Sequence, residues 1–259
     1  MALFQSGNPT LSEKIFSRSA AQISGETMTV RGAINKFGFL LLMVIAGAAF
    51  VWHQYYVKIA LADAQQSVGT YMMVGVFGGL ICALAIIFKP TWAPYLSPAY
   101  GLLEGLFLGG ISAVLNDAFS EKYPDLILQA VGLTFGVAIA MFLLYNFRII
   151  KPTEKFRSVI VSATMGIAIF YLLTLVLGWF NVNVSFMYDS SPLGIGISLF
   201  VVAIAALNLI LDFDMIERGA DAGAPKFMEW YGAFGLLVTM VWLYLEILKL
   251  LARFAGNRR

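Results

Sequence analysis

Residues 71–88 of the chain are YMMVGVFGGLICALAIIF, a run without a charged side chain. As an α-helix, this run rises about 27 Å, close to the roughly 30 Å hydrocarbon core of a bilayer. A strand of a membrane β-barrel would be about half as long and would alternate apolar with polar residues, which this run does not do. The stretch therefore predicts a membrane-spanning α-helix.

Six further apolar runs of similar length share this pattern. In chain order the seven runs are 33–52, 71–88, 99–115, 126–147, 159–180, 193–211 and 232–251. Of the 259 residues, 60% are hydrophobic and 12% are charged, against about 45–50% apolar and 25% charged in a soluble domain. We therefore expect an all-α integral membrane protein, a seven-transmembrane-helix bundle, and not a soluble enzyme.

The polar residues divide the chain into three parts. We expect a polar cytosolic N-terminal tail at 1–30, the transmembrane domain at 31–252 and a basic C-terminal tail at 253–259. Loops rich in Lys and Arg stay on the cytosolic side, and such residues gather before the first run and after the fourth: Lys14, Arg18, Arg31, Lys36, Arg148, Lys151, Lys155 and Arg157. The N-terminus is therefore predicted in the cytosol. An odd number of spans would export the basic C-terminal tail, so its side stays open.

Few residues are suited to catalysis or to metal binding. The chain has one histidine, His53, and one cysteine, Cys82. Multi-His and Cys-based metal sites are therefore excluded, as is a disulfide within the chain. No Gly-rich phosphate-binding loop is present. Transport or regulation in the lipid bilayer remains, and we expect no cofactor and no nucleic-acid partner.

Glycines at four-residue spacing mark one face of three predicted helices. Without a hydrophobic force between helices in lipid, association depends on close contact across small side chains. We therefore expect these faces to point into the bundle, and their residues are Gly75 and Gly79, Gly101, Gly105 and Gly109, and Gly132 and Gly136.

Four acidic residues lie inside or beside the apolar runs, namely Glu104, Asp212, Asp214 and Glu246. A carboxylate at the bilayer centre costs about 2.5 kcal/mol or more, so such a residue is a candidate functional site. The alternative is a protonated acid that hydrogen-bonds to a neighbouring helix, and for Glu104 both interpretations are kept. Asp214 is better explained as a solvated helix end.

Two further polar residues support a cluster in the cytosolic half of the bundle. Asn208 lies four residues before Asp212, so the two share a helix face. Lys36 enters the first predicted helix from the same side and is the nearest candidate counter-charge for Glu104. Residues 213–231, with two Gly and a Pro, are predicted to form a cytosolic connection without a continuous helix.

Three motifs resemble the Bax inhibitor-1 family, in its bacterial YccA-like branch. They are EGLFLG at 104–109, LDFDMI at 211–216 and LYLEIL at 243–248. The resemblance implies a seven-helix bundle with a central last helix, in which Asp212 and Glu246 match two acids that share a proton and gate a calcium leak. Asp214 stands where the family often has Gln, and 218–225 looks like an insertion. A straight seventh helix from Gly232 would carry Glu246 about 21 Å across the membrane, so the pair requires that helix to begin later, bend or re-enter.

The resemblance thus implies a pH-regulated cation leak, for calcium, in the bacterial cytoplasmic membrane. Its partners would be the lipid bilayer, protons and calcium as the permeant ion, which takes oxygen ligands. The alternative is a non-conducting regulator that binds other membrane proteins, such as quality-control proteases or death regulators. A proton-coupled transporter would need an inverted repeat, and no convincing one is found.

Overall fold

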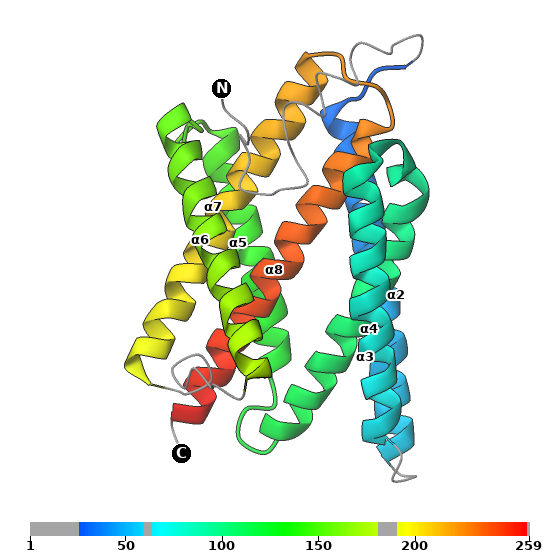
Figure 1. The fold of residues 1–259 in the computed structure, drawn as a ribbon, viewed down its shortest axis with the longest axis vertical. Coiled ribbons are helices and arrows are strands. Elements are labelled where there is room, and N and C mark those ends of the chain that lie inside the picture. The colour runs from blue at the N-terminus through cyan, green and yellow to red at the C-terminus, as the bar shows by residue number, and fades with distance from the viewer. Residues whose placement is uncertain (1–25, 60–63, 181–190, 258–259) are drawn as a thin grey trace. The chain divides into compact units, whose positions relative to one another are not determined.

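The computed structural model describes residues 26–59, 64–180 and 191–257. In these ranges the chain forms α-helices and one short 3-10 helix, and no strand. The elements are α2 (Val30–Ile59), α3 (Ala64–Phe88), η1 (Pro90–Trp92), α4 (Ala93–Phe119), α5 (Leu126–Asn146), α6 (Glu154–Trp179), α7 (Pro192–Asp221) and α8 (Met228–Asn257) (Figure 1). Within the described chain, seven helices are long and apolar enough to cross a membrane. The predicted all-α, seven-helix architecture is confirmed, and the chain is a multi-pass membrane protein.

The connection between α7 and α8 is shorter than predicted. Helix α7 continues to Asp221 and α8 begins at Met228, so the predicted helix-free connection at 213–231 is wrong. The helix stops at Gly223, which has a φ of 67°, a left-handed conformation that glycine adopts without steric cost. Pro225 follows, and it lacks the N–H that a continuing helix requires.

The chain divides into two compact units, each described here by itself. Unit 1 contains α5, α6 and the parts of α7 and α8 within Phe119–Asp214 and Thr239–Arg259. Unit 2 contains α2, α3 and α4 up to Ala118, with the end of α7 and the start of α8 within Met215–Val238.

In unit 2, the glycine faces of α3 and α4 form close helix contacts, as predicted. A Cβ atom on Gly105 of α4 would lie 2.3 Å from the carbonyl oxygen of Val44 in α2. A Cβ on Gly75 of α3 would lie 2.6 Å from the carbonyl oxygen of Leu103. These positions admit only glycine because the neighbouring atom is backbone, so the glycines set how closely the three helices pack.

The glycine face predicted for α5 in unit 1 is wrong. A Cβ on Gly132 or Gly136 would meet no atom within 4 Å. The buried residues of α5 are Leu126, Ala130, Thr134 and Tyr145, which lie on another side of the helix. Since α5 is apolar all round, its composition does not reveal which side is buried.

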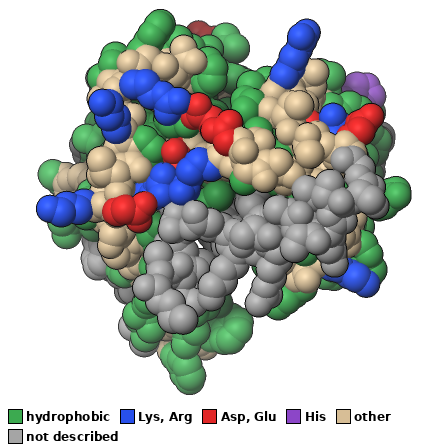
Figure 2. Space-filling view, turned by 90° about the horizontal axis from the view of Figure 1, so that it is seen from above, with side chains coloured by type: hydrophobic (Ala, Val, Ile, Leu, Met, Phe, Trp, Pro, Cys, Tyr) green, Lys and Arg blue, Asp and Glu red, His purple; other side chains and the backbone are tan. Residues whose placement is uncertain are grey.

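The core of unit 1 lies between α6, α7 and α8. Ile160 and Ile167 of α6 pack with Ile204 and Leu211 of α7, and Trp242 of α8 packs against this cluster. Many large apolar side chains of this unit are exposed instead, among them Leu128, Leu172 and Phe200, which are 71%, 62% and 55% exposed. Seen from above the orientation of Figure 1, basic and acidic side chains gather on the face that Figure 2 shows. Outward apolar flanks with a charged end are what a bilayer requires.

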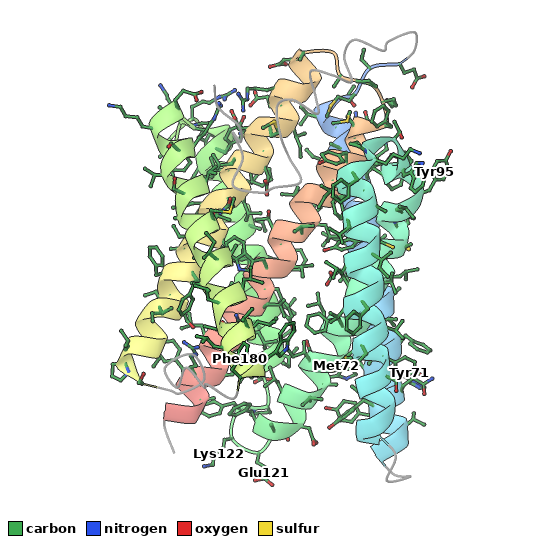
Figure 3. All side chains as sticks on the ribbon, in the orientation of Figure 1. Tyr71, Met72, Tyr95, Glu121, Lys122 and Phe180 are labelled. Carbon is green, nitrogen blue, oxygen red and sulfur yellow. The ribbon has the colours of Figure 1, made fainter. Side chains whose placement is uncertain are left out.

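Some of the charged residues that were used to predict the orientation in the membrane lie at opposite ends of α5. In unit 1, Glu121 and Lys122 lie in the turn between α4 and α5 (Figure 3), while Arg148 and Lys151 lie beyond the other end of α5. Four of the basic residues named in the tails, Lys14, Arg18, Arg258 and Arg259, lie outside the described residues.

Candidate functional site

A buried ion pair joins the start of α6 to α7 in unit 1. The side chain of Thr153 caps α6 by accepting a hydrogen bond from the backbone N–H of Phe156, and Arg157 follows in the first turn. The guanidinium of Arg157 donates to a carboxylate oxygen of Asp214 over 2.6 Å, and both side chains are 9% exposed. Asp214 is therefore a buried ion-pair partner and not the solvated helix end that the sequence suggested.

A second polar contact joins the same two helices further along α6. The amide of Asn208 in α7 donates to the hydroxyl of Thr164 over 2.8 Å and to the carbonyl of Ile204 over 2.9 Å. Asn208 is 1% exposed. The prediction that Asn208 points into the bundle is therefore confirmed.

A third contact joins α6 to α8. The hydroxyl of Tyr171 donates to Glu246 over 3.0 Å, and the ammonium of Lys249 donates to the same oxygen over 2.6 Å. The Lys249 ammonium also lies 4.9 Å from the centre of the Tyr171 ring. Glu246 is 2% exposed, so its carboxylate is buried beside its own cation.

The three contacts share one face of α6. Arg157, Thr164 and Tyr171 are spaced by seven residues, nearly two full turns, so successive side chains lie about 10 Å apart along the same side. Ile160 and Ile167 lie between them in the apolar core. We call the three contacts, Arg157 with Asp214, Thr164 with Asn208 and Tyr171 with Glu246, the polar ladder. The sequence analysis missed its α6 members, although their seven-residue spacing was a signal that could have found them.

Asp212 and Glu246 lie at different levels of this ladder. Asp212 is fully buried on α7, four residues after Asn208 and two before Asp214, and therefore belongs near the first two contacts. Glu246 is at the third contact, and Arg157 and Tyr171 are about 21 Å apart by the helical rise. Helix α8 is continuous and begins at Met228, earlier than Gly232. A shared proton between Asp212 and Glu246 stays a prediction.

Glu104 and Lys36 have separate partners in unit 2. Glu104 is half-buried on α4, hydrogen-bonds to Tyr100, and has one carboxylate oxygen 3.2 Å from where a Cβ on Gly79 would lie. The ammonium of Lys36 instead pairs with Glu229 at the start of α8. The sequence analysis did not name Glu229, because it considered only acids inside or beside the apolar runs and assigned Lys36 to Glu104.

Metal-binding clusters were sought in the same residues. Within the described parts of the chain, no three His, Cys, Asp or Glu side chains come together in a way that could hold a metal ion. Cys82 is a free, half-buried thiol on α3. The polar ladder is a row of carboxylate, hydroxyl and amide groups along helices that are otherwise apolar.

Comparison with known proteins places the chain in a family. The sequence model described as Bax inhibitor 1 like matches residues 8–256, nearly the whole chain. The members of this family are generally non-enzymatic membrane proteins. The comparison with curated proteins found no match, and neither did the comparison with solved structures. With seven apolar helices and a match of this extent, the chain belongs to the Bax inhibitor 1 like family.

Proposed function

We propose that this protein is a pH-regulated cation leak channel of a bacterial cytoplasmic membrane, with calcium as the permeant ion. Asp212 and Glu246 are its proton-sensing residues in this proposal. The observation that supports it is the polar ladder, which puts polar contacts at three depths along α6 in unit 1. The bacterial membrane follows from the resemblance of the three sequence motifs to the bacterial YccA-like branch.

The ladder has the chemistry that a calcium pathway needs. Ionisable residues within membrane spans are rare and mark ion or proton pathways. Calcium takes oxygen ligands only, and the ladder supplies the carboxylates of Asp214 and Glu246 and the hydroxyls of Thr164 and Tyr171. Steps of about 10 Å between these contacts suit an ion that passes between weak sites and is not held at one of them.

Protonation provides the regulation in this proposal. A protonated carboxylate carries no charge and attracts no cation, whereas the ionised form does. Flux should therefore rise as the pH rises through the titration of the carboxylates. A proton shared by Asp212 and Glu246 would make that rise one cooperative step, whereas titration at separate levels of the ladder would make it two.

The proposal is tested by calcium entry into liposomes that contain the purified protein and a trapped calcium indicator. We expect entry that depends on the protein and rises across a series of increasing pH values. The change Glu121→Gln removes an exposed carboxylate from the turn after α4 and should leave the profile unchanged. Entry equal to that of protein-free liposomes at every pH would contradict the proposal.

One observation favours the alternative, a non-conducting regulator that binds other membrane proteins. Buried acids here have internal cations: Arg157 pairs with Asp214, Lys249 with Glu246 and Lys36 with Glu229. Such pairs suit groups that hold helices together. For a regulator, Asp212→Asn and Glu246→Gln should change no flux, because both replacements keep the shape of the side chain.

A further inference from the structure

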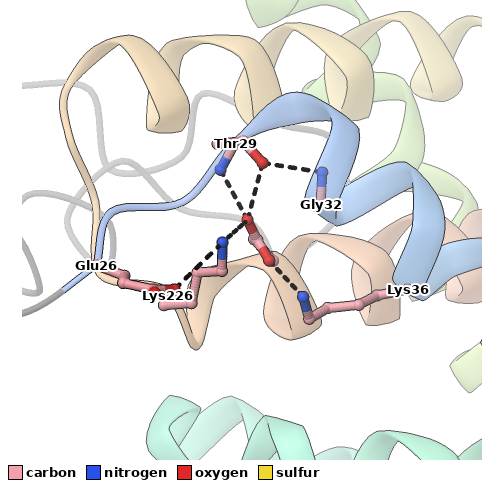
Figure 4. Close-up of polar contacts among 6 residues, drawn as sticks. Glu26, Thr29, Gly32, Lys36 and Lys226 are labelled. Carbon is pink, nitrogen blue, oxygen red and sulfur yellow. Dashed lines mark hydrogen bonds and ion pairs between the residues drawn. The ribbon is translucent and has the colours of Figure 1, made fainter.

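A fully buried carboxylate in unit 2 ties the start of α2 to the start of α8. One oxygen of Glu229 accepts from the backbone N–H of Thr29 over 2.8 Å, from its hydroxyl over 3.0 Å and from the Lys226 ammonium over 3.2 Å. The other oxygen accepts from Lys36 (Figure 4). The Glu229 side chain is 0% exposed, against 20% for Lys36 and 46% for Lys226. Glu229 is thus surrounded by donors from two segments far apart in the sequence.

Backbone hydrogen bonds fasten the same two segments together. The N–H of Met28 donates to the carbonyl of Ala224 over 2.7 Å, and the N–H of Lys226 donates to the carbonyl of Glu26 over 3.0 Å. Between these bonds Thr27 faces Pro225 in an antiparallel bridge. Proline fits there because this position of the bridge needs no N–H donor. We call residues 26–29 the strap: backbone hydrogen bonds hold it to the α7–α8 connection, and Met28 within it is buried, at 2% exposed.

The fit around Glu229 leaves no spare room. A Cβ on Gly32, one turn into α2, would lie 2.1 Å from a carboxylate oxygen of Glu229. The N–H of Gly32 donates to the Thr29 hydroxyl over 3.0 Å, so that hydroxyl bonds to α2 as well as to Glu229. Lys36 also lies over the ring of Trp230, 5.5 Å from its centre. A buried carboxylate held this closely is costly to release, because the ions would be left without partners.

We propose that Glu229 is a lock that holds the strap on the α7–α8 connection, and that the closed lock restrains α8 and limits conduction. The inference rests on the proposed function, because α8 is one continuous helix whose first turn carries the lock and whose later part carries Glu246 of the polar ladder. When the contacts of Glu229 with Thr29 and Lys36 are broken, the first turn of α8 is no longer fastened to α2, and α8 becomes freer to move. The strap is the last part of the N-terminal tail predicted at 1–30 to be cytosolic, so a signal that acts on that tail would reach the lock directly.

The first experiment tests the lock alone, by hydrogen exchange of the backbone amides of Met28 and Thr29 in the full-length protein. Glu229→Gln should speed their exchange about tenfold, since each hydrogen bond to a charged group contributes about that factor or more. Glu121→Gln, in the exposed turn after α4, should leave it unchanged. Equal exchange in the wild type and in Glu229→Gln would overturn the lock.

The second experiment tests the link to conduction with a reversible bond across the strap. Cys82→Ser leaves a chain without its own thiol, and Thr27→Cys with Pro225→Cys then puts two thiols at facing positions, where Cα atoms lie about 4.5 Å apart and a disulfide fits. In this background Glu229→Gln should raise calcium entry several-fold when the thiols are reduced. Oxidation should return entry to the level of the same double-cysteine chain with Glu229 intact. A variant that leaks because it is misfolded would not be restored by a disulfide across the strap, so recovery on oxidation excludes misfolding as the cause.

The two measurements separate the possible failures. Faster exchange with unchanged calcium entry would overturn the link between the lock and conduction. Calcium entry that rises and is not reversed by oxidation would also overturn it, because the strap would then not be the restraint. Absence of entry in every variant, the parent included, would overturn the proposed function and the link with it, while the exchange rates still decide whether Glu229 is the lock.

Discussion

The ammonium of Lys249 lies 2.6 Å from a carboxylate oxygen of Glu246, one turn earlier on α8. The Tyr171 hydroxyl donates to the same oxygen, and the Glu246 side chain is 3% exposed. The position that a permeant cation would take at Glu246 is thus held by a cation fixed to the protein. The Lys249 side chain is itself 44% exposed, so the protein encloses the carboxylate of this pair but not its cation.

Lys249→Met should raise calcium entry into liposomes, because the Glu246 carboxylate would then be free to attract the permeant ion. Lys249→Arg should keep entry near the wild-type level, since the guanidinium restores the charge. Lys122→Met, in the exposed turn before α5, is the matched control and should have no effect. Entry that is unchanged in Lys249→Met would argue against Glu246 as part of the pathway.

Asp212→Asn and Glu246→Gln should each weaken the pH dependence of calcium entry, and together they should weaken it further. The physical reason is that Glu246 is at the third contact of the polar ladder, whereas Asp212 lies near the first two contacts, which are about 21 Å and about 10 Å from the third along α6. Groups this far apart act independently, and their effects add. A double variant no weaker than either single one would instead show that the two residues act as one unit, as a shared proton requires.

Arg157→Met should destabilise the protein, because the buried Asp214 carboxylate would lose the guanidinium that lies 2.6 Å away. Breaking one partner of a buried ion pair costs about 3–5 kcal/mol. Adding Asp214→Leu should recover much of this loss, since the buried carboxylate that Arg157 neutralises is then removed. Thermal unfolding in detergent measures both, with Lys155→Met on the exposed side of α6 as the control. Equal melting temperatures for Arg157→Met and the control would contradict a stabilising ion pair.

Gly105→Ala should lower stability far more than Gly132→Ala. A methyl on Gly105 would lie 2.3 Å from a backbone oxygen of α2, which cannot move without moving the helix, whereas one on Gly132 would meet nothing within 4 Å. Gly132→Ala should stabilise α5 by up to about 1 kcal/mol, the difference in helix propensity between the two residues. Thermal unfolding of the two variants, prepared in parallel, compares them directly. A similar loss of stability in both variants would show that the glycine face of α5 packs against another helix.

Cysteine labelling should show which ends of unit 1 face the cytosol. In the Cys82→Ser background, Lys151→Cys between α5 and α6 should resist a membrane-impermeant thiol reagent added to intact cells. Lys122→Cys, beyond the opposite end of α5, should react with it. Both side chains are exposed, so differences in burial do not explain a difference in rate. The reverse pattern of labelling would invert the predicted orientation.

The sequence by itself determined the seven spans, although most of the helices extend beyond the predicted limits, by up to ten residues at the end of α7. Whether a segment can lie in a bilayer depends on its own length and apolar content, since lipid solvates each helix separately. The small-residue argument placed Gly105 of α4 at a helix contact, but the same argument failed for Gly132 of α5, so glycine spacing alone does not determine which face is packed. The end of α7 was missed, since Gly223 and not Gly219 adopts the left-handed conformation that stops the helix, and sequence spacing does not distinguish the two.

Only the tertiary structure decided which residues meet. Lys36 was assigned to Glu104 from a shared side of the membrane, yet it pairs with Glu229, and Arg157 proved to be the partner of Asp214. The reason is rotational. Membrane helices are apolar on most sides, so their sequences fix depth but leave the rotation of each helix about its axis open. That rotation is set by packing between helices distant in the chain, and it alone determines that Tyr171 faces Glu246 and that Gly132 faces outward.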